Sequence, residues 1–304
     1  MREAQWEPLP ILTMKYLYKT ILMMLAILLP ASSTILAQQR ELPFQAGEKA
    51  QIIIHYKYGP KMDIGKMDIA VTEKSGLMNV RADISTYSFW DKFYKVRDVY
   101  ETTFTKDGIV PVKAYRDVHE GDFWARSDYD WRNGGRTLHA VVDKKNRPHR
   151  DTVYNESKPV RDVMNLFFAI RALDIDKLID GKVAHQIVAM DKDLLNVKLK
   201  FFGREEKKIS GLGTFRTIKL GVTVNARNVE EVPESDKSNF SIAAEKGDGG
   251  DENVFYGNSK IFIWVSDDEN HMPLFFSAPV KVGSINGRLA DFSGLKYPLT
   301  SKIE

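Results

Sequence analysis

Apolar and polar residues alternate along most of the chain from Ala50 onward. The clearest run covers residues 123–131, where Phe, Ala, Ser, Tyr and Trp alternate with Trp, Arg, Asp and Asp. A period of two places successive side chains on opposite faces of a half-buried strand. Later strand-like runs occupy 183–190, 194–202, 214–224, 260–266, 274–282 and 288–292.

Turn residues separate these runs at short intervals. Gly59-Pro60, Asn133-Gly134-Gly135 and Asn286-Gly287 each stand between two apolar segments. Such dipeptides favour tight hairpins. The pattern therefore predicts an all-β, mainly antiparallel fold: a strongly curved sheet or an open, barrel-like meander.

One segment departs from the period of two. Ser157 is a candidate N-cap and Pro159 fits a first helical turn, and apolar residues then recur at helical spacing at Val160, Val163, Met164, Phe167 and Ile170. We expect one principal helix, about residues 158–173, covering one face or opening of the sheet.

The N-terminal region has the pattern of a signal peptide. Lys15 and Lys19 precede an apolar run at 20–29, and small residues lead to Ala37. The apolar core of about ten residues is shorter than the roughly 20 that a membrane helix needs. We expect cleavage of residues 1–37 and a periplasmic or otherwise exported protein with no transmembrane anchor after cleavage. Residues 1–13 carry acids and prolines, so we expect Met14 to be the start.

The remaining chain, 38–304, is expected to form a single mature β domain. Between about 225 and 253 the composition changes to Glu, Pro, Ser, Asp, Lys and Gly. This composition is typical of a mobile surface loop.

Composition excludes several classes of site. The 304 residues include no cysteine, which excludes disulfides, thiolate metal sites, a cysteine nucleophile and a lipid-bearing cysteine. The net charge is +3 and basic residues are interspersed with acids, so no nucleic acid partner is expected.

Known catalytic signatures are absent from the sequence. It contains no Gly-x-Ser-x-Gly, no His-Glu-x-x-His, no phosphate-binding loop and no EF-hand spacing. The six histidines are spread singly, so no metal site and no cofactor is predicted.

Charged and aromatic residues gather on three consecutive predicted strands. In a meander these residues become neighbours. They either line a polar groove or form ion pairs on a solvated face, and the sequence favours the solvated face. Two tryptophans near turns could line the floor of a cavity or pack in the core. The candidate ligand-binding residues are Trp90, Arg97, Tyr100, Tyr115, Arg116, Trp124, Arg126 and Asp128.

Several separated motifs occur in the order found in one family. They include Gly47-Glu-Lys49, Asp98-Val-Tyr-Glu-Thr102, Gly213-Thr-Phe215 and Ile263-Trp-Val-Ser-Asp-Asp268. On these motifs the chain, over roughly 44–298, resembles the bacterial domain of unknown function family 3108. The resemblance implies an exported, largely β envelope protein and implies no assigned activity, catalytic residue or cofactor.

Three functional hypotheses remain open. The leading one is a non-enzymatic binding or carrier protein that holds an apolar or amphipathic envelope ligand, a lipid or a glycan, in the concave face. The second is a glycan or lipid hydrolase that uses paired acids among Glu120, Asp128 and Asp130. The third is a structural or assembly partner of another envelope protein, docking through a strand edge or the 225–253 loop.

Overall fold

The computed structural model describes residues 41–57, 61–226, 261–280 and 283–304. The predicted signal peptide, 1–37, and nearly all of the predicted loop at 225–253 lie outside these ranges. The fold described below belongs to the compact unit Leu42–Glu304. No helix among the described residues is long and apolar enough to cross a membrane.

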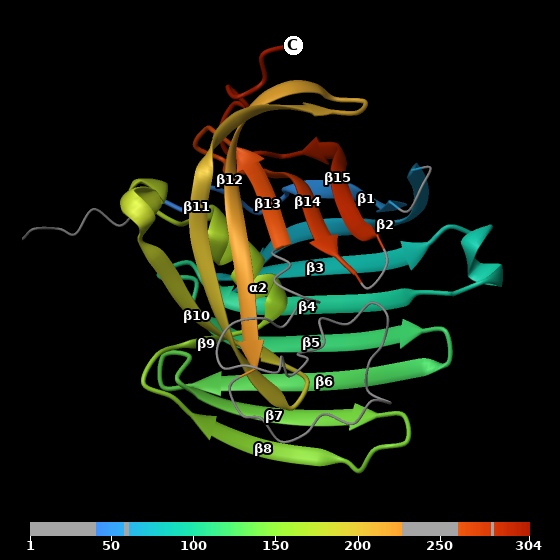
Figure 1. Ribbon diagram of the computed structural model, residues 1–304. Coiled ribbons are helices and arrows are strands. Elements are labelled where there is room, and N and C mark those ends of the chain that lie inside the picture. Colours follow the sequence, from blue (N-terminus) through green and yellow to red (C-terminus); the bar gives the residue numbers. More distant parts are fainter. Residues whose placement is uncertain (1–40, 58–60, 227–260, 281–282) are drawn as a thin grey trace, which may run out of the picture. The chain divides into compact units, whose positions relative to one another are not determined.

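The described strands form one continuous sheet, in the order β8-β7-β6-β5-β4-β3-β2-β1-β15-β14-β13-β12-β11-β10-β9 (Figure 1). The strands are β1 Lys49–Lys57, β2 Lys61–Lys74, β3 Leu77–Thr86, β4 Arg97–Thr105, β5 Pro111–Glu120, β6 Phe123–Arg132, β7 Thr137–Lys144, β8 Arg150–Asn155, β9 Val160–Arg161, β10 Val183–Met190, β11 Asp193–Ile209, β12 Gly213–Ala226, β13 Ile261–Ser266, β14 Pro273–Pro279 and β15 Ser284–Ser293. Short 3₁₀ helices η1, Trp90–Lys92, and η2, Ile175–Gly181, accompany the α-helix α2, Val163–Arg171.

The sheet consists of two meanders joined edge to edge. Strands β1 to β8 follow one another across the sheet, β10 to β15 do the same, and β1 pairs with β15. All neighbours are antiparallel except β9 and β10, which pair in parallel over two residues. The predicted mainly antiparallel, curved and unclosed sheet is confirmed.

Alternation along each strand gives the sheet two different faces. In β6, Ala125 and Tyr129 are buried whereas Arg126 and Asp128 are exposed. We call the buried side, which packs against α2, the inner face, and the solvated side the outer face.

The helix α2 fills the inner face between the two meanders. Phe168 belongs to the apolar cluster of β1–β4 and β15, while Ile170 belongs to the cluster of β10–β13. A third cluster joins the inner faces of β6 and β7 to β10 and β11. Figure 1 shows β11 and β12 crossing over the strands of the first meander, with α2 between them.

The helix is shorter than the predicted 158–173. Its N-cap is Asp162, whose Oδ1 accepts hydrogen bonds from the N–H groups of Met164 and Asn165, both at 2.9 Å. Ser157 is not the cap, and Val160–Arg161 forms β9 instead. The helical spacing of Val160 is a coincidence, because its side chain is buried between β6–β7 and β10–β11. Asp162 is the better cap because a carboxylate satisfies two of the free N–H groups of the first turn.

A buried ion pair holds the C-terminal end of α2. Arg171 is 1% exposed and pairs with Glu48, which is 2% exposed. The same guanidinium donates to the carbonyl oxygens of Pro43 and Asn270, each at 3.2 Å. The carbonyl of Arg171 in turn lies 2.7 Å from Nδ1 of His271. One side chain therefore joins the helix to two distant segments of the chain.

We expect Glu48→Gln to lower the free energy of unfolding by about 3–5 kcal/mol, because it leaves the Arg171 charge buried without its counter-ion. The double variant Glu48→Leu/Arg171→Met should be more stable than Glu48→Gln, because it removes both charges. Urea unfolding followed by circular dichroism measures both effects. As a control, Asp128→Asn breaks the exposed Arg126–Asp128 pair and should cost less than about 1 kcal/mol. Equal costs for Glu48→Gln and Asp128→Asn would contradict this role of the ion pair.

Candidate functional site

The eight predicted ligand-binding residues divide between the two faces and one connecting loop. Tyr100 and Arg116 are on the inner face, where Arg116 is 6% exposed and its Nε donates to the Tyr100 hydroxyl at 3.3 Å. Trp90 lies in η1, and its Nε1 donates to the carbonyl of Asp63 at 3.0 Å. Trp124 is exposed on the outer face of β6.

The charged members on the outer face form ion pairs with one another. Arg126 Nε lies 3.2 Å from Asp128 Oδ2, and its guanidinium carbon is 5.0 Å from the centre of the Tyr115 ring. At the start of β4, Arg97 pairs with Asp91 at 2.6 Å. These contacts support a solvated face and not a polar groove.

A second group of polar side chains, buried or half-buried, lies at the inner face. Arg116, Ser127, Tyr129 and Lys144 of β5, β6 and β7 all contact Asp191, which lies in the turn between β10 and β11. We call these five residues the inner polar cluster. Sequence reasoning missed Lys144 and Asp191, because the Asp191-Lys192 turn gives no local sign of a partner so distant along the chain.

Asp191 is the anion of this cluster. Its carboxylate pairs with Arg116 and with Lys144 Nζ, the latter at 2.6 Å, and accepts from Ser127 Oγ at 3.3 Å. Its carbonyl accepts from the Tyr129 hydroxyl at 2.9 Å. Burial alone would raise the pKa of Asp191, but Arg116 and Lys144 hold that pKa below its usual value. The carboxylate therefore stays charged, facing two cations.

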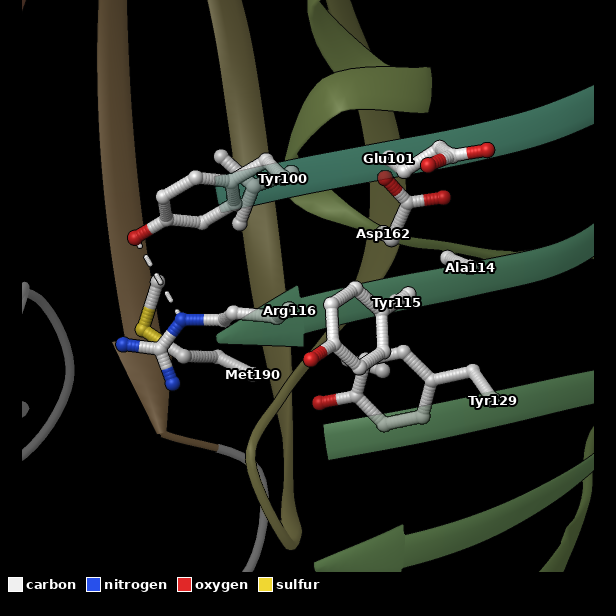
Figure 2. A pocket seen from close by; sticks show the side chains of 10 residues that line it. Tyr100, Glu101, Ala114, Tyr115, Arg116, Tyr129, Asp162 and Met190 are labelled. Atoms are coloured by element: carbon white, nitrogen blue, oxygen red, sulfur yellow. Dashed lines mark hydrogen bonds between the residues drawn. The ribbon is translucent and has the colours of Figure 1, made fainter. Parts of the chain in front are cut away.

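A small cavity adjoins the cluster beside the N-terminus of α2 (Figure 2). Its volume is about 10 Å³, which is about the space that one water molecule requires. Asp162 reaches this wall and accepts from the Thr102 hydroxyl at 2.6 Å. The residues of the wall include Tyr100, Tyr115, Arg116, Tyr129, Asp162 and Met190. The first three of these are among the predicted ligand-binding residues.

Two carboxyl groups are buried farther along β4 and β5. Asp98 and Glu120 are 5% and 4% exposed, and Asp98 Oδ1 accepts from the N–H of His119 at 3.0 Å. Burial and the nearby Glu120 raise the pKa of Asp98 to about 7. By the same causes the pKa of Tyr94 rises to about 12. The acidic neighbour of Glu120 is therefore Asp98. The two other acids of the hydrolase hypothesis, Asp128 and Asp130, lie on strand β6.

No group of three or more histidine or carboxylate side chains in the described part of the chain could hold a metal ion. The site consists instead of a paired anion, two cations and the two inner-face tyrosines, Tyr100 and Tyr129, beside apolar clusters. Such a set can bind and orient a charged group, which is the chemistry of recognition.

Comparison with known proteins gives a family and a similar fold. A family model described as "Protein of unknown function (DUF3108)" matches residues 51–290. Among solved structures, the chain is similar to a β-barrel-like protein of domain of unknown function DUF1849 from Brucella abortus. The match has 9% sequence identity, covers 84% of this chain and 99% of that one, and has a TM-score of 0.50. This likeness concerns the fold alone. No curated protein matches the chain.

Asp98 should make the protein less stable as the pH rises towards neutrality. Its pKa is higher in the folded protein, about 7, than the ordinary 3.8. The folded state therefore binds more protons than the unfolded chain between these values, and the free energy of unfolding falls as the pH rises from about 4 to about 7. Asp98→Asn, which stays neutral, should remove this dependence and raise stability at pH 8 by about 2–4 kcal/mol.

Urea unfolding at a series of pH values tests this expectation, with the exposed Asp128→Asn as control. An Asp98→Asn variant whose stability follows the wild-type pH profile would show that Asp98 is not the responsible group.

Proposed function

The chain belongs to the DUF3108 family of proteins of unknown function, and we propose that it is a non-enzymatic binding protein for an anionic, amphipathic molecule of the cell envelope. The observation that carries this proposal is the inner polar cluster, in which two cations of one meander, the buried Arg116 and the half-buried Lys144, face a carboxylate from a hairpin of the other.

Side chains join the two meanders at this place. The hydrogen-bonded order of strands ends at β8 on one side and at β9 on the other. The inner faces of β6–β7 and β10–β11 meet through the inner polar cluster and through apolar contacts such as Trp131 and Ile187. The tip of the β10–β11 hairpin around Asp191 can therefore move away without breaking hydrogen bonds between neighbouring strands of β4–β7, while β10 and β11 keep their pairing with β9 and β12.

Such a movement would uncover two cations and an apolar wall. If Asp191 leaves with its hairpin, Arg116 and Lys144 remain on the inner face without that carboxylate. Beside them lies an apolar wall that includes Leu138 and Ala140. A carboxylate or phosphate bound to the two cations, with an acyl chain on the wall, satisfies both parts of the surface. Asp191 occupies, in this proposal, the place of the ligand's anionic group.

The volume of the cavity decides which conformation is described here. A cavity of about 10 Å³ has no room for an acyl chain. The conformation described here is therefore the closed one, and ligand affinity depends on how often the hairpin opens. Variants that weaken the Asp191 contacts should raise the apparent affinity.

The hydrolase hypothesis receives less support from the geometry. Asp128 and Asp130 point to the outer face, where they pair with Arg126 and Lys113 at 3.2 and 3.6 Å. Neither carboxylate lies beside Glu120, so this set provides no acid and base on opposite sides of one substrate.

We expect the protein to bind lysophosphatidylglycerol more tightly than lysophosphatidylcholine. Asp191→Asn should strengthen the binding of the anionic lipid about tenfold, because the closed state loses the ion pairs of Asp191 with Arg116 and Lys144. Arg116→Gln and Lys144→Gln should each reduce the preference for the anionic head group. Native mass spectrometry and calorimetry below the micellar concentration measure these affinities.

The matched control is Arg126→Gln/Asp128→Asn, an ion pair on the opposite face of β6, which should leave lipid binding unchanged. Circular dichroism identifies any variant that fails to fold. If neither the wild-type protein nor Asp191→Asn binds lysophosphatidylglycerol, the proposed function is wrong. If both bind it equally, the role given to Asp191 is wrong.

We also propose that the protein is exported, on the basis of the basic, apolar and small-residue pattern before Gln38. Expressed in a Gram-negative host, it should be recovered from the periplasmic fraction with an intact mass that begins at Gln38. Ala37→Leu should block this processing and give a heavier species. A cytoplasmic protein that keeps residues 14–37 would contradict export.

A further inference from the structure

Three aromatic rings are gathered on the loop between β3 and β4, where Phe89 and Phe93 are exposed and Trp90 is half-buried. Phe89 is 61% and Phe93 is 71% exposed, and the 3₁₀ helix that starts at Trp90 has no buried residue. The ring centres lie 5.1 Å apart for Phe89 and Trp90, 5.8 Å for Phe89 and Phe93, and 6.0 Å for Trp90 and Phe93. We call Phe89, Trp90 and Phe93 the aromatic tip. Single exposed apolar residues are common, but a contiguous group indicates a binding surface.

Hydrogen bonds hold the loop of the aromatic tip in one conformation. The N–H groups of Phe93 and Tyr94 both donate to the Trp90 carbonyl at 2.9 Å. Asp91 accepts from the Thr86 hydroxyl at 2.6 Å and pairs with Arg97. The rings are thus presented by an ordered loop, so little conformational entropy is lost when they bind.

The neighbouring β5–β6 hairpin supports the aromatic tip. The Gly121 N–H donates to the Lys95 carbonyl at 2.8 Å. The Tyr94 ring lies against Gly121 so closely that a Cβ there would come within 3.0 Å of it. The same hairpin carries Trp124, which is 39% exposed. The exposed rings therefore come from two connections at one end of the strands.

The segment that carries the aromatic tip has a net positive charge. Between Tyr87 and Arg97 the chain has three basic residues and one acid, a net charge of +2. Asp91 is already paired with Arg97, whereas Lys92 and Lys95 are exposed. Aromatic rings flanked by lysines match the interface of an anionic bilayer, where rings lie at the head-group level and ammonium groups meet lipid phosphates.

The size of the tip favours a bilayer over a protein. At about 200 Å² for a whole ring, the exposed parts of Phe89 and Phe93 amount to roughly 250 Å². A stable protein interface requires about 800 Å² on each partner. A bilayer surface needs no complementary shape and accepts a small group of rings on the end of a loop.

We propose that the aromatic tip docks the protein on the surface of a bilayer that contains anionic phospholipid, with Phe89, Trp90 and Phe93 at the head-group level and Lys92 and Lys95 against the phosphates. This docking surface is separate from the inner polar cluster, and either proposal can fail without the other.

The test is co-sedimentation of the protein, purified from the periplasm, with vesicles of phosphatidylglycerol and phosphatidylethanolamine, and with vesicles of phosphatidylcholine alone. The wild type should bind the first kind more strongly. Phe89→Ser/Phe93→Ser should lower the partition coefficient about tenfold or more on both kinds. Lys92→Gln/Lys95→Gln should lower it on the anionic vesicles only, and most at low salt.

The matched controls change residues of similar exposure elsewhere. Val153→Ser/Ile303→Ser replaces two apolar residues that are 56% and 44% exposed, and Lys177→Gln removes a lysine with an 80% exposed side chain. Both should bind vesicles as the wild type does. In addition, a brominated phospholipid should quench wild-type tryptophan fluorescence, and Trp90→Phe should lose most of this quenching.

Failure of the wild type to bind the phosphatidylglycerol vesicles would overturn the proposal. So would equal losses for Phe89→Ser/Phe93→Ser and Val153→Ser/Ile303→Ser. A loss of vesicle binding in Asp191→Asn, with the aromatic tip intact, would also overturn it, because it would place the membrane contact at the inner face.

Discussion

The buried contact between Arg171 and Glu48 constrains the rest of this fold. A guanidinium that is 1% exposed must find all of its acceptors inside the protein. It finds them in the segment that leads into β1 and in the turn between β13 and β14. The Phe44 and Phe168 rings lie over the same guanidinium, at 5.2 and 5.4 Å from its central carbon. The two meanders are thereby held to the same helix end.

The opposite end of α2 is held by a different interaction. Asp162 caps the helix and accepts from the Thr102 hydroxyl of β4, so this end is tied to the first meander. Its carboxyl group stands at the wall of the small cavity, next to the inner polar cluster. A helix held at both ends gives the inner face a fixed boundary, against which the β10–β11 hairpin can rest or move. The carrier proposal therefore places the motion in the hairpin and leaves α2 in place.

Local features of the sequence were enough to predict the strands but not the site. The alternation at 123–131 matches β6, Phe123–Arg132, because a period of two is encoded within a single strand. The helix start was wrong because Val160 has helical spacing for reasons of packing alone. Tyr100 and Arg116 were among the candidates, but the contact of Lys144 with Asp191 joins residues of two different meanders. No periodicity reports which distant hairpin reaches a given face.

The strands at the two ends of the sheet determine whether copies of the protein can associate edge to edge. An unclosed sheet leaves backbone donors and acceptors along its first and last strands, and long, flat strands of this kind invite another chain to add itself. Here one terminal strand, β9, has two residues, and the other, β8, carries Arg150 and Asp151 among its six. Neither offers a long apolar template. The architecture can therefore stay unclosed with little tendency to grow into fibrils.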